Sequence, residues 1–112
     1  MQASPDEERW VGEFITQQRR ARLREHIIAE AWADNGRIER HLAPAGDVEW
    51  IRVNGQDIGG GPGNADRARE GVEVVEALEQ ERPPLVQRES PRLYRLTPAG
   101  RSVARTERRG SR

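Results

Sequence analysis

Apolar residues recur at helical spacing through the first third of the chain. Ser4-Pro5-Asp6-Glu7 predicts a helix start, because the Ser4 side chain can accept hydrogen bonds from free backbone amides and Pro5 suits the first helical position. Asn35-Gly36 predicts the end of that helix. The apolar positions between these signals are Trp10, Val11, Phe14, Ile15, Leu23, Ile27, Ile28, Ala31 and Trp32.

A helix over about residues 5–34 would be about 45 Å long, which is more than a small core can cover. Two expectations follow and the pattern does not separate them. Either the helix breaks near residues 17–20, or its first half protrudes and packs against a second chain. In the second case Trp10 and Phe14 are the expected contacts of a homodimer.

The middle of the chain is less regular. Residues 37–42 predict one more helical turn, ended by Pro44, and residues 48–53 predict a strand. Asn54-Gly55 is typical of a two-residue hairpin turn, which would pair Val53 with Gln56 and leave residues 48–58 as a hairpin. The alternative is a short helix over residues 54–58, the second helix of a helix-turn-helix.

The second half of the chain predicts a helix, a hairpin and a last helix. A glycine loop over residues 59–63 precedes Asn64, which caps a helix reaching about residue 80. Pro83-Pro84 ends that helix, and strands are expected over 85–88 and 92–96. Thr97 and Pro98 start the last helix, which we expect to fade into a disordered basic tail over 106–112. The apolar stripe of the middle helix is Ala68, Val72, Val75 and Leu78.

Composition narrows the class of protein. A chain of 112 residues predicts one small domain. The absence of cysteine excludes disulfides and thiolate chemistry, and all 19 cationic side chains are arginine, which excludes lysine-based catalysis. No apolar run is long enough to cross a membrane and the polar N-terminus is unlike a signal peptide, so we expect a cytoplasmic protein.

A net charge of zero hides a strong asymmetry. Residues 1–81 carry 10 arginines and 17 acids, a net charge of −7, whereas residues 82–112 carry 9 arginines and 2 acids, a net charge of +7. Such a split predicts a basic element that seeks phosphate or another acidic surface. A second basic cluster contains Arg19, Arg20, Arg22 and Arg24. It is either a solvated helix surface or a surface that makes backbone contacts or ion pairs with the acidic faces of a partner.

The stretch VVEALEQERPPLVQRESPRLYRLTPAGRSVA, residues 74–104, resembles the second half of bacterial winged-helix regulators of the MarR and PadR type. The string Tyr94-Arg95-Leu96-Thr97-Pro98-Ala99-Gly100-Arg101 is the closest match. The resemblance implies an α+β, mainly α fold: a winged helix-turn-helix with a long N-terminal helix and a C-terminal β-hairpin wing. It divides the chain into a helix that could dimerise (1–36), a winged-helix domain (37–105) and a tail (106–112).

The resemblance also implies that the protein binds double-stranded DNA. The expected contacts are the first turn of the middle helix, the wing and the start of the last helix: Asn64, Arg67, Arg69, Arg88, Arg92, Arg95 and Arg101. Beyond its first turn, the outer face of the middle helix is acidic, which fits a phosphate-lined groove poorly.

No motif predicts catalysis, a cofactor or a metal ion. The two histidines, His26 and His41, lack ligand spacing, and no serine lies in a nucleophile context. The leading hypothesis is a small bacterial or phage transcriptional regulator that contacts DNA phosphates through its basic wing and tail. The alternative is an assembly module that uses a winged-helix scaffold to bind proteins and not DNA.

Overall fold

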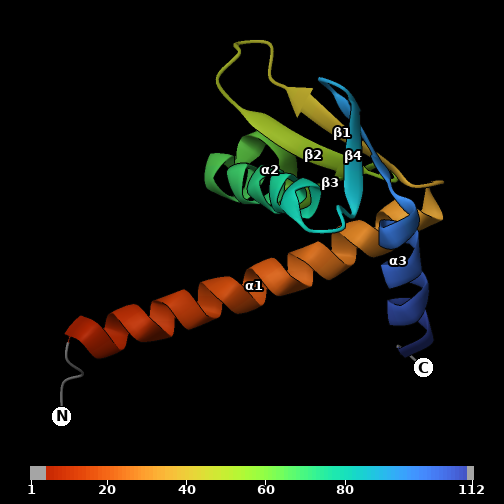
Figure 1. Ribbon diagram of the computed structural model, residues 1–112. Coiled ribbons are helices and arrows are strands. Elements are labelled where there is room, and N and C mark those ends of the chain that lie inside the picture. The colour runs from red at the N-terminus through yellow and green to blue at the C-terminus, as the bar shows by residue number, and fades with distance from the viewer. Residues whose placement is uncertain (1–4, 111–112) are drawn as a thin grey trace.

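The computed structural model describes residues 5–110, and the side chains of residues 10–107. The expected Ser4 cap lies outside the described residues. Three α-helices of 29, 16 and 13 residues contain more than half of the chain, and the rest is mainly one antiparallel sheet. The elements are α1 (Pro5–Ala33), β1 (Arg37–Leu42), β2 (Glu49–Val53), β3 (Gln56–Asp57), the 3-10 helix η1 (Ile58–Gly63), α2 (Ala65–Gln80), β4 (Val86–Ser90), β5 (Leu93–Leu96) and α3 (Pro98–Gly110). The α+β class is therefore confirmed (Figure 1).

The central strand of the sheet is β1, and its position corrects the sequence analysis. The strand order is β3-β2-β1-β5-β4, so β1 pairs with β2 on one side and with β5 on the other. The prediction of a helical turn over residues 37–42 is wrong. Hydrogen bonds to strands on both sides, and the complete burial of Ile38, outweigh the weak local preference of these residues.

The hairpin predicted for residues 48–58 is confirmed, and the alternative helix is wrong. Val53 pairs with Gln56 in the predicted register. Asn54 and Gly55 have φ angles of 50° and 77°, as a two-residue hairpin turn with both central residues at positive φ requires. Ile51 and Ile58 are both buried beyond this turn.

One hydrophobic core joins the inner face of the sheet to the three helices. The second half of α1 contributes Ile27, Ile28 and Ala31, and the predicted stripe of α2 is buried throughout. Tyr94 is the largest fully buried side chain. The sheet residues of this core are Ile38, Ile51, Val53, Val86, Tyr94 and Leu96.

The first half of α1 protrudes from the rest of the molecule (Figure 1). The helix is continuous, so the expected break near residues 17–20 is absent. Residues 13–33 contain neither glycine nor proline, and nothing in this sequence interrupts the backbone hydrogen bonds. The large apolar side chains of this protruding part are exposed: Trp10 by 66%, Val11 by 48%, Phe14 by 47% and Ile15 by 54%. We call residues 10–15 the α1 tip.

The last helix is longer than expected. The predicted Thr97 cap is confirmed, because its hydroxyl accepts a hydrogen bond from the Gly100 amide at 3.1 Å. The helix α3 continues to Gly110, so a disordered tail from residue 106 is wrong for residues 106–110. Packing of Ala104 in the core and an ion pair between Arg24 and Glu107 at 3.7 Å hold this helix against α1. Residues 111–112 lie outside the described residues.

Gly100 lies where α3 passes closest to the loop before β4. A Cβ atom at this position would lie 2.0 Å from the carbonyl oxygen of Leu85, whereas a Cβ atom at Gly12 on α1 would meet nothing within 4 Å. We expect Gly100→Ala to lower the free energy of unfolding by about 1–3 kcal/mol, because backbone must move to make room. Gly12→Ala should leave it unchanged or raise it by up to about 1 kcal/mol through helix propensity. Urea unfolding of both variants checks this, and equal stability of the two would contradict the close packing at Gly100.

Candidate nucleic-acid interface

The three residues predicted at the start of α2 are only partly available to DNA. The Asn64 side chain accepts a hydrogen bond from the Arg67 amide at 3.3 Å, and it therefore caps the helix. The Arg67 guanidinium lies 3.7 Å from the Glu70 carboxylate. Arg69 is exposed and lines a groove of about 330 Å³, but the groove is also lined by four acids, Asp47, Glu49, Glu73 and Glu76.

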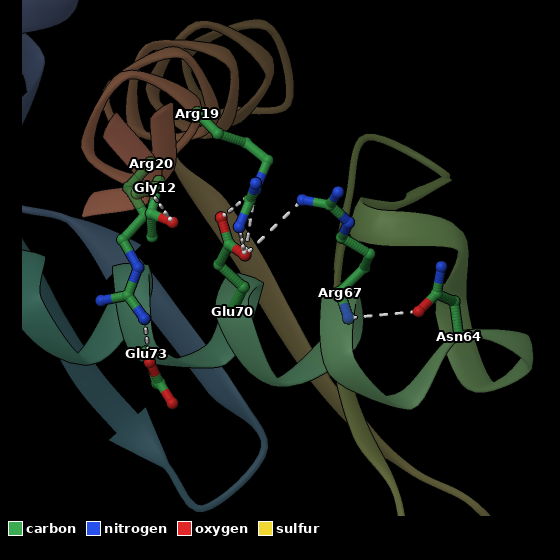
Figure 2. Close-up of polar contacts among 8 residues, drawn as sticks. Gly12, Arg19, Arg20, Asn64, Arg67, Glu70 and Glu73 are labelled. Atoms are coloured by element: carbon green, nitrogen blue, oxygen red, sulfur yellow. Dashed lines mark hydrogen bonds and ion pairs between the residues drawn. The ribbon is translucent and has the colours of Figure 1, made fainter. Parts of the chain in front are cut away.

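The basic cluster of α1 meets the acidic face of α2. Arg19 donates from Nε to Oε1 of Glu70 at 2.8 Å and from Nη2 to Oε2 at 2.9 Å. Arg20 donates to Glu73 one turn further along (Figure 2). Arg24 donates to Glu81 at 3.2 Å. We call these three pairs the arginine ladder. For three of the four arginines, the acidic partner is the protein's own second helix with its C-cap residue Glu81.

Glu70 is the most enclosed carboxylate of the ladder. Only 8% of this residue is exposed, and its two oxygens accept from the Arg19 guanidinium. This hydrogen bonding lowers the pKa of Glu70 and outweighs burial, which acts in the opposite direction. The same contact raises the pKa of Arg19.

In the wing, the guanidinium of Arg88 contacts Tyr94 and that of Arg92 lies near Glu49. Arg88 donates to the Tyr94 hydroxyl and lies over its ring, 4.9 Å from the centroid. Arg40 donates to Glu49 and, at 3.0 Å, to the same Tyr94 hydroxyl. The hydrogen bond between Arg40 and Glu49 raises the pKa of Arg40 and lowers the pKa of Glu49. Arg92 is 50% exposed, with its Nη1 atom 3.9 Å from Glu49. These guanidiniums are partly neutralised within the fold.

The remaining predicted residues, Arg95 and Arg101, meet at the C-terminal end of α1. Both donate to the carbonyl oxygen of Asn35, at 3.4 Å and 3.3 Å. The last carbonyl groups of a helix carry partial negative charge, so this end of α1 attracts both cations. Gly36 makes the approach possible, because a Cβ atom there would lie 2.9 Å from the Arg101 guanidinium.

Two further arginines, neither of them among the expected DNA contacts, lie next to this pair along the sheet and the helix. Arg37 is the direct cross-strand neighbour of Arg95, and Arg105 follows Arg101 by one helical turn. Both are exposed, and no carboxylate of the described residues pairs with either one. Arg37 could not be found from the sequence, because residues 37–42 were expected to be helical. We call Arg37, Arg95, Arg101 and Arg105 the junction cluster.

The junction cluster concentrates like charge at a cost in stability. Like charges directly opposite one another on neighbouring strands are destabilising, and so are like charges four residues apart on a helix. Among the described residues, Glu89 is the one carboxylate that pairs with a member of the cluster, at 2.5 Å from Arg95. The cluster therefore keeps an excess of positive charge.

The predicted interface residues Trp10 and Phe14 lie on the α1 tip, with their rings stacked at a centroid distance of 5.8 Å and an angle of 8°. Whether they form a homodimer contact stays a prediction.

His41 stacks on Trp50 at 5.4 Å, and His26 lies on α1. In the described part of the chain, no three histidine, aspartate or glutamate side chains are placed to hold a metal ion. Within residues 5–110, no helix has the length and apolar character to cross a membrane.

The chain matches no family model, no curated protein and no solved structure.

The Arg19–Glu70 contact makes stability depend on pH. A carboxyl whose pKa is lower in the folded protein than in the unfolded chain stabilises the fold above its unfolded value, and that contribution is lost as the pH falls through the folded value. The lowered pKa of Glu70 therefore predicts that stability is lost as the pH falls below the ordinary carboxyl value of 4.5. Glu70→Gln should be less stable than wild type at pH 7 and should lose less on acidification, as measured by urea unfolding.

Glu79→Gln is the matched control, because Glu79 lies on the same helix and forms no ion pair with a described residue. Its pH dependence should follow that of the wild type. Acid sensitivity that is identical in all three proteins would refute a stabilising role for the Arg19–Glu70 contact.

Proposed function

We propose that the protein binds double-stranded DNA through the junction cluster, by contacts to the phosphate backbone, and that it acts as a transcriptional regulator. The observation that carries the proposal is the crowding of four guanidiniums at the meeting point of β1, β5 and α3 with one paired carboxylate. The electrostatic repulsion among these guanidiniums is reduced when an anionic partner binds. Arginine suits phosphate because its planar guanidinium can donate two parallel hydrogen bonds.

Parts of the expected winged helix support this proposal. The order β1-β5-β4, the β4–β5 hairpin and the following α3 are the arrangement that a wing requires. The region between β1 and α2 departs from a helix-turn-helix, because it contains the β2–β3 hairpin and η1. In addition, the acidic face of α2 is occupied by arginines of α1. The proposal is therefore one of backbone binding, and α2 is not assigned the reading of bases.

The alternative function is an assembly module that binds other proteins. The α1 tip favours it, since four large apolar side chains are exposed on one protruding half-helix. The two functions are compatible in one molecule, but they predict different responses to salt. Phosphate contacts weaken steeply with salt, whereas apolar contacts do not.

A DNA titration with a double variant tests the proposal. Arg37→Gln combined with Arg105→Gln removes two exposed cations that form no ion pair with a described carboxylate, so the fold should be retained. Each phosphate contact contributes about 0.9 to the slope of log affinity against log salt, and we expect the slope to fall by about 1.8. Fluorescence anisotropy with a labelled duplex at four or five salt concentrations measures it.

Arg69→Gln is the matched comparison, because it removes an exposed arginine from α2. It should leave the slope nearly unchanged. A loss with Arg69→Gln alone would instead assign binding to α2, as the sequence analysis expected. Absence of duplex binding by the wild type at low salt would refute DNA binding and favour the assembly module.

A further inference from the structure

We infer that a pocket between α1, η1 and α2 binds a small aliphatic carboxylate, with the hydrocarbon chain inside the pocket and the carboxylate at Arg22 and His26. This site is separate from the junction cluster, and the inference is independent of DNA binding. The pocket has a volume of about 320 Å³. Pockets for small molecules have volumes of about 300–1,000 Å³, so this one accepts a compact ligand and is too small for a polymer.

The accessible wall of the pocket is almost entirely apolar, although arginines line it. The α1 side is formed by Arg22, Leu23 and His26, and the opposite side by Gly59 of η1 and Arg67 of α2. Arginine side chains bury their methylene groups against apolar surface and keep the guanidinium in water. The interior of the pocket therefore favours hydrocarbon, and its rim favours an anion.

Contacts within the chain hold the two sides of the pocket in place. Arg19 from α1 and Arg67 from α2 both reach the Glu70 carboxylate, at 2.8 Å and 3.7 Å (Figure 2). On the η1 side, a Cβ atom at Gly59 would lie 2.5 Å from the Arg67 carbonyl oxygen, so η1 and α2 approach as closely as glycine allows. The pocket is therefore formed before a ligand binds, which lowers the cost of binding.

Charge determines which end group of a ligand the pocket accepts. Three arginines and one glutamate line it, an excess of two positive charges before any charge on His26 is counted. The Glu70 oxygens are occupied by Arg19. Arg22 and His26 are exposed, lie four residues apart on one face of α1, and form no hydrogen bond or ion pair with a described residue. Two free donors on either side of Leu23 suit a carboxylate, and the excess positive charge disfavours a cation.

The volume of the pocket sets the length of the hydrocarbon chain. A group the size of a water molecule occupies about 30 Å³, so the pocket has room for about ten such groups. Octanoate is a saturated carboxylate of this size and is therefore the probe. A ligand of about ten non-hydrogen atoms is expected to bind with a Kd of about 1 mM or lower.

An NMR titration with octanoate tests the site and the ligand class. Saturable changes in chemical shift are expected at the backbone amides of the pocket, those of Leu23, His26, Gly59 and Arg67, and not at the α1 tip. Octan-1-ol keeps the chain without the charge, and butyrate keeps the charge with a shorter chain. Each should bind about tenfold more weakly than octanoate, or weaker still. Binding at the α1 tip in place of the pocket, no binding at tens of millimolar octanoate, or equal affinity for octan-1-ol would overturn the inference.

Two arginine variants separate the pocket from a general attraction for anions. Arg22→Gln removes the free guanidinium of the pocket and should weaken octanoate binding about tenfold. Arg69→Gln is the matched control, because it removes one positive charge from an exposed side chain that does not line this pocket. Its affinity should stay within about twofold of the wild type, since salt screens charges that lie far from the ligand. Both side chains are exposed, so both variants should fold, as their amide spectra will show. An unchanged affinity in Arg22→Gln, or an equal loss in both variants, refutes the assignment of the carboxylate to this pocket.

Discussion

The position of α1 depends on its contact with α2, and the Arg19–Glu70 ion pair is the most enclosed part of that contact. A carboxylate with 8% of its residue exposed needs a partner, because an unpaired charge at a buried position is strongly destabilising. Arg19 supplies two hydrogen bonds in one geometry. The outer pairs of the arginine ladder are more exposed and individually weak. Together with the core residues of α1, Glu70 sets the line along which the helix leaves the molecule.

The contact between α1 and α2 separates the arginines of the protein into groups with different roles. Those of the ladder are neutralised by α2, and those around Tyr94 and Glu49 stabilise the wing. The junction cluster is left with an excess of positive charge, held near the negative end of α1 by the Asn35 carbonyl. Behind the net charge of zero, the described residues therefore combine paired charges along the ladder with an excess of positive charge at the junction cluster.

The central strand β1 connects the two halves of the sheet and creates the junction cluster. It joins the β2–β3 hairpin to the β4–β5 hairpin, and its first residue, Arg37, comes opposite Arg95 by that pairing. Gly36 and Gly100 allow the backbone and side chains around this strand to approach closely. The same close packing places α3, with Arg101 and Arg105, beside the end of α1.

The sequence by itself determined the features that depend on neighbours along the chain. Helical spacing and caps located α1, α2 and the start of α3, and Asn54-Gly55 located a hairpin with its register, because these signals act within a few residues. Only the tertiary structure decided that residues 37–42 form a strand, that Glu70 and its neighbours pair with α1, and that Arg37 joins Arg95 and Arg101. The contacts of Arg37 with Arg95, of Arg19 with Glu70 and of Arg101 with Asn35 join residues more than 50 positions apart, and the strand at residues 37–42 also needs β2, 7 to 13 positions away. No local pattern indicates which distant strand will pair with a given strand, or which distant side chain will neutralise a given charge.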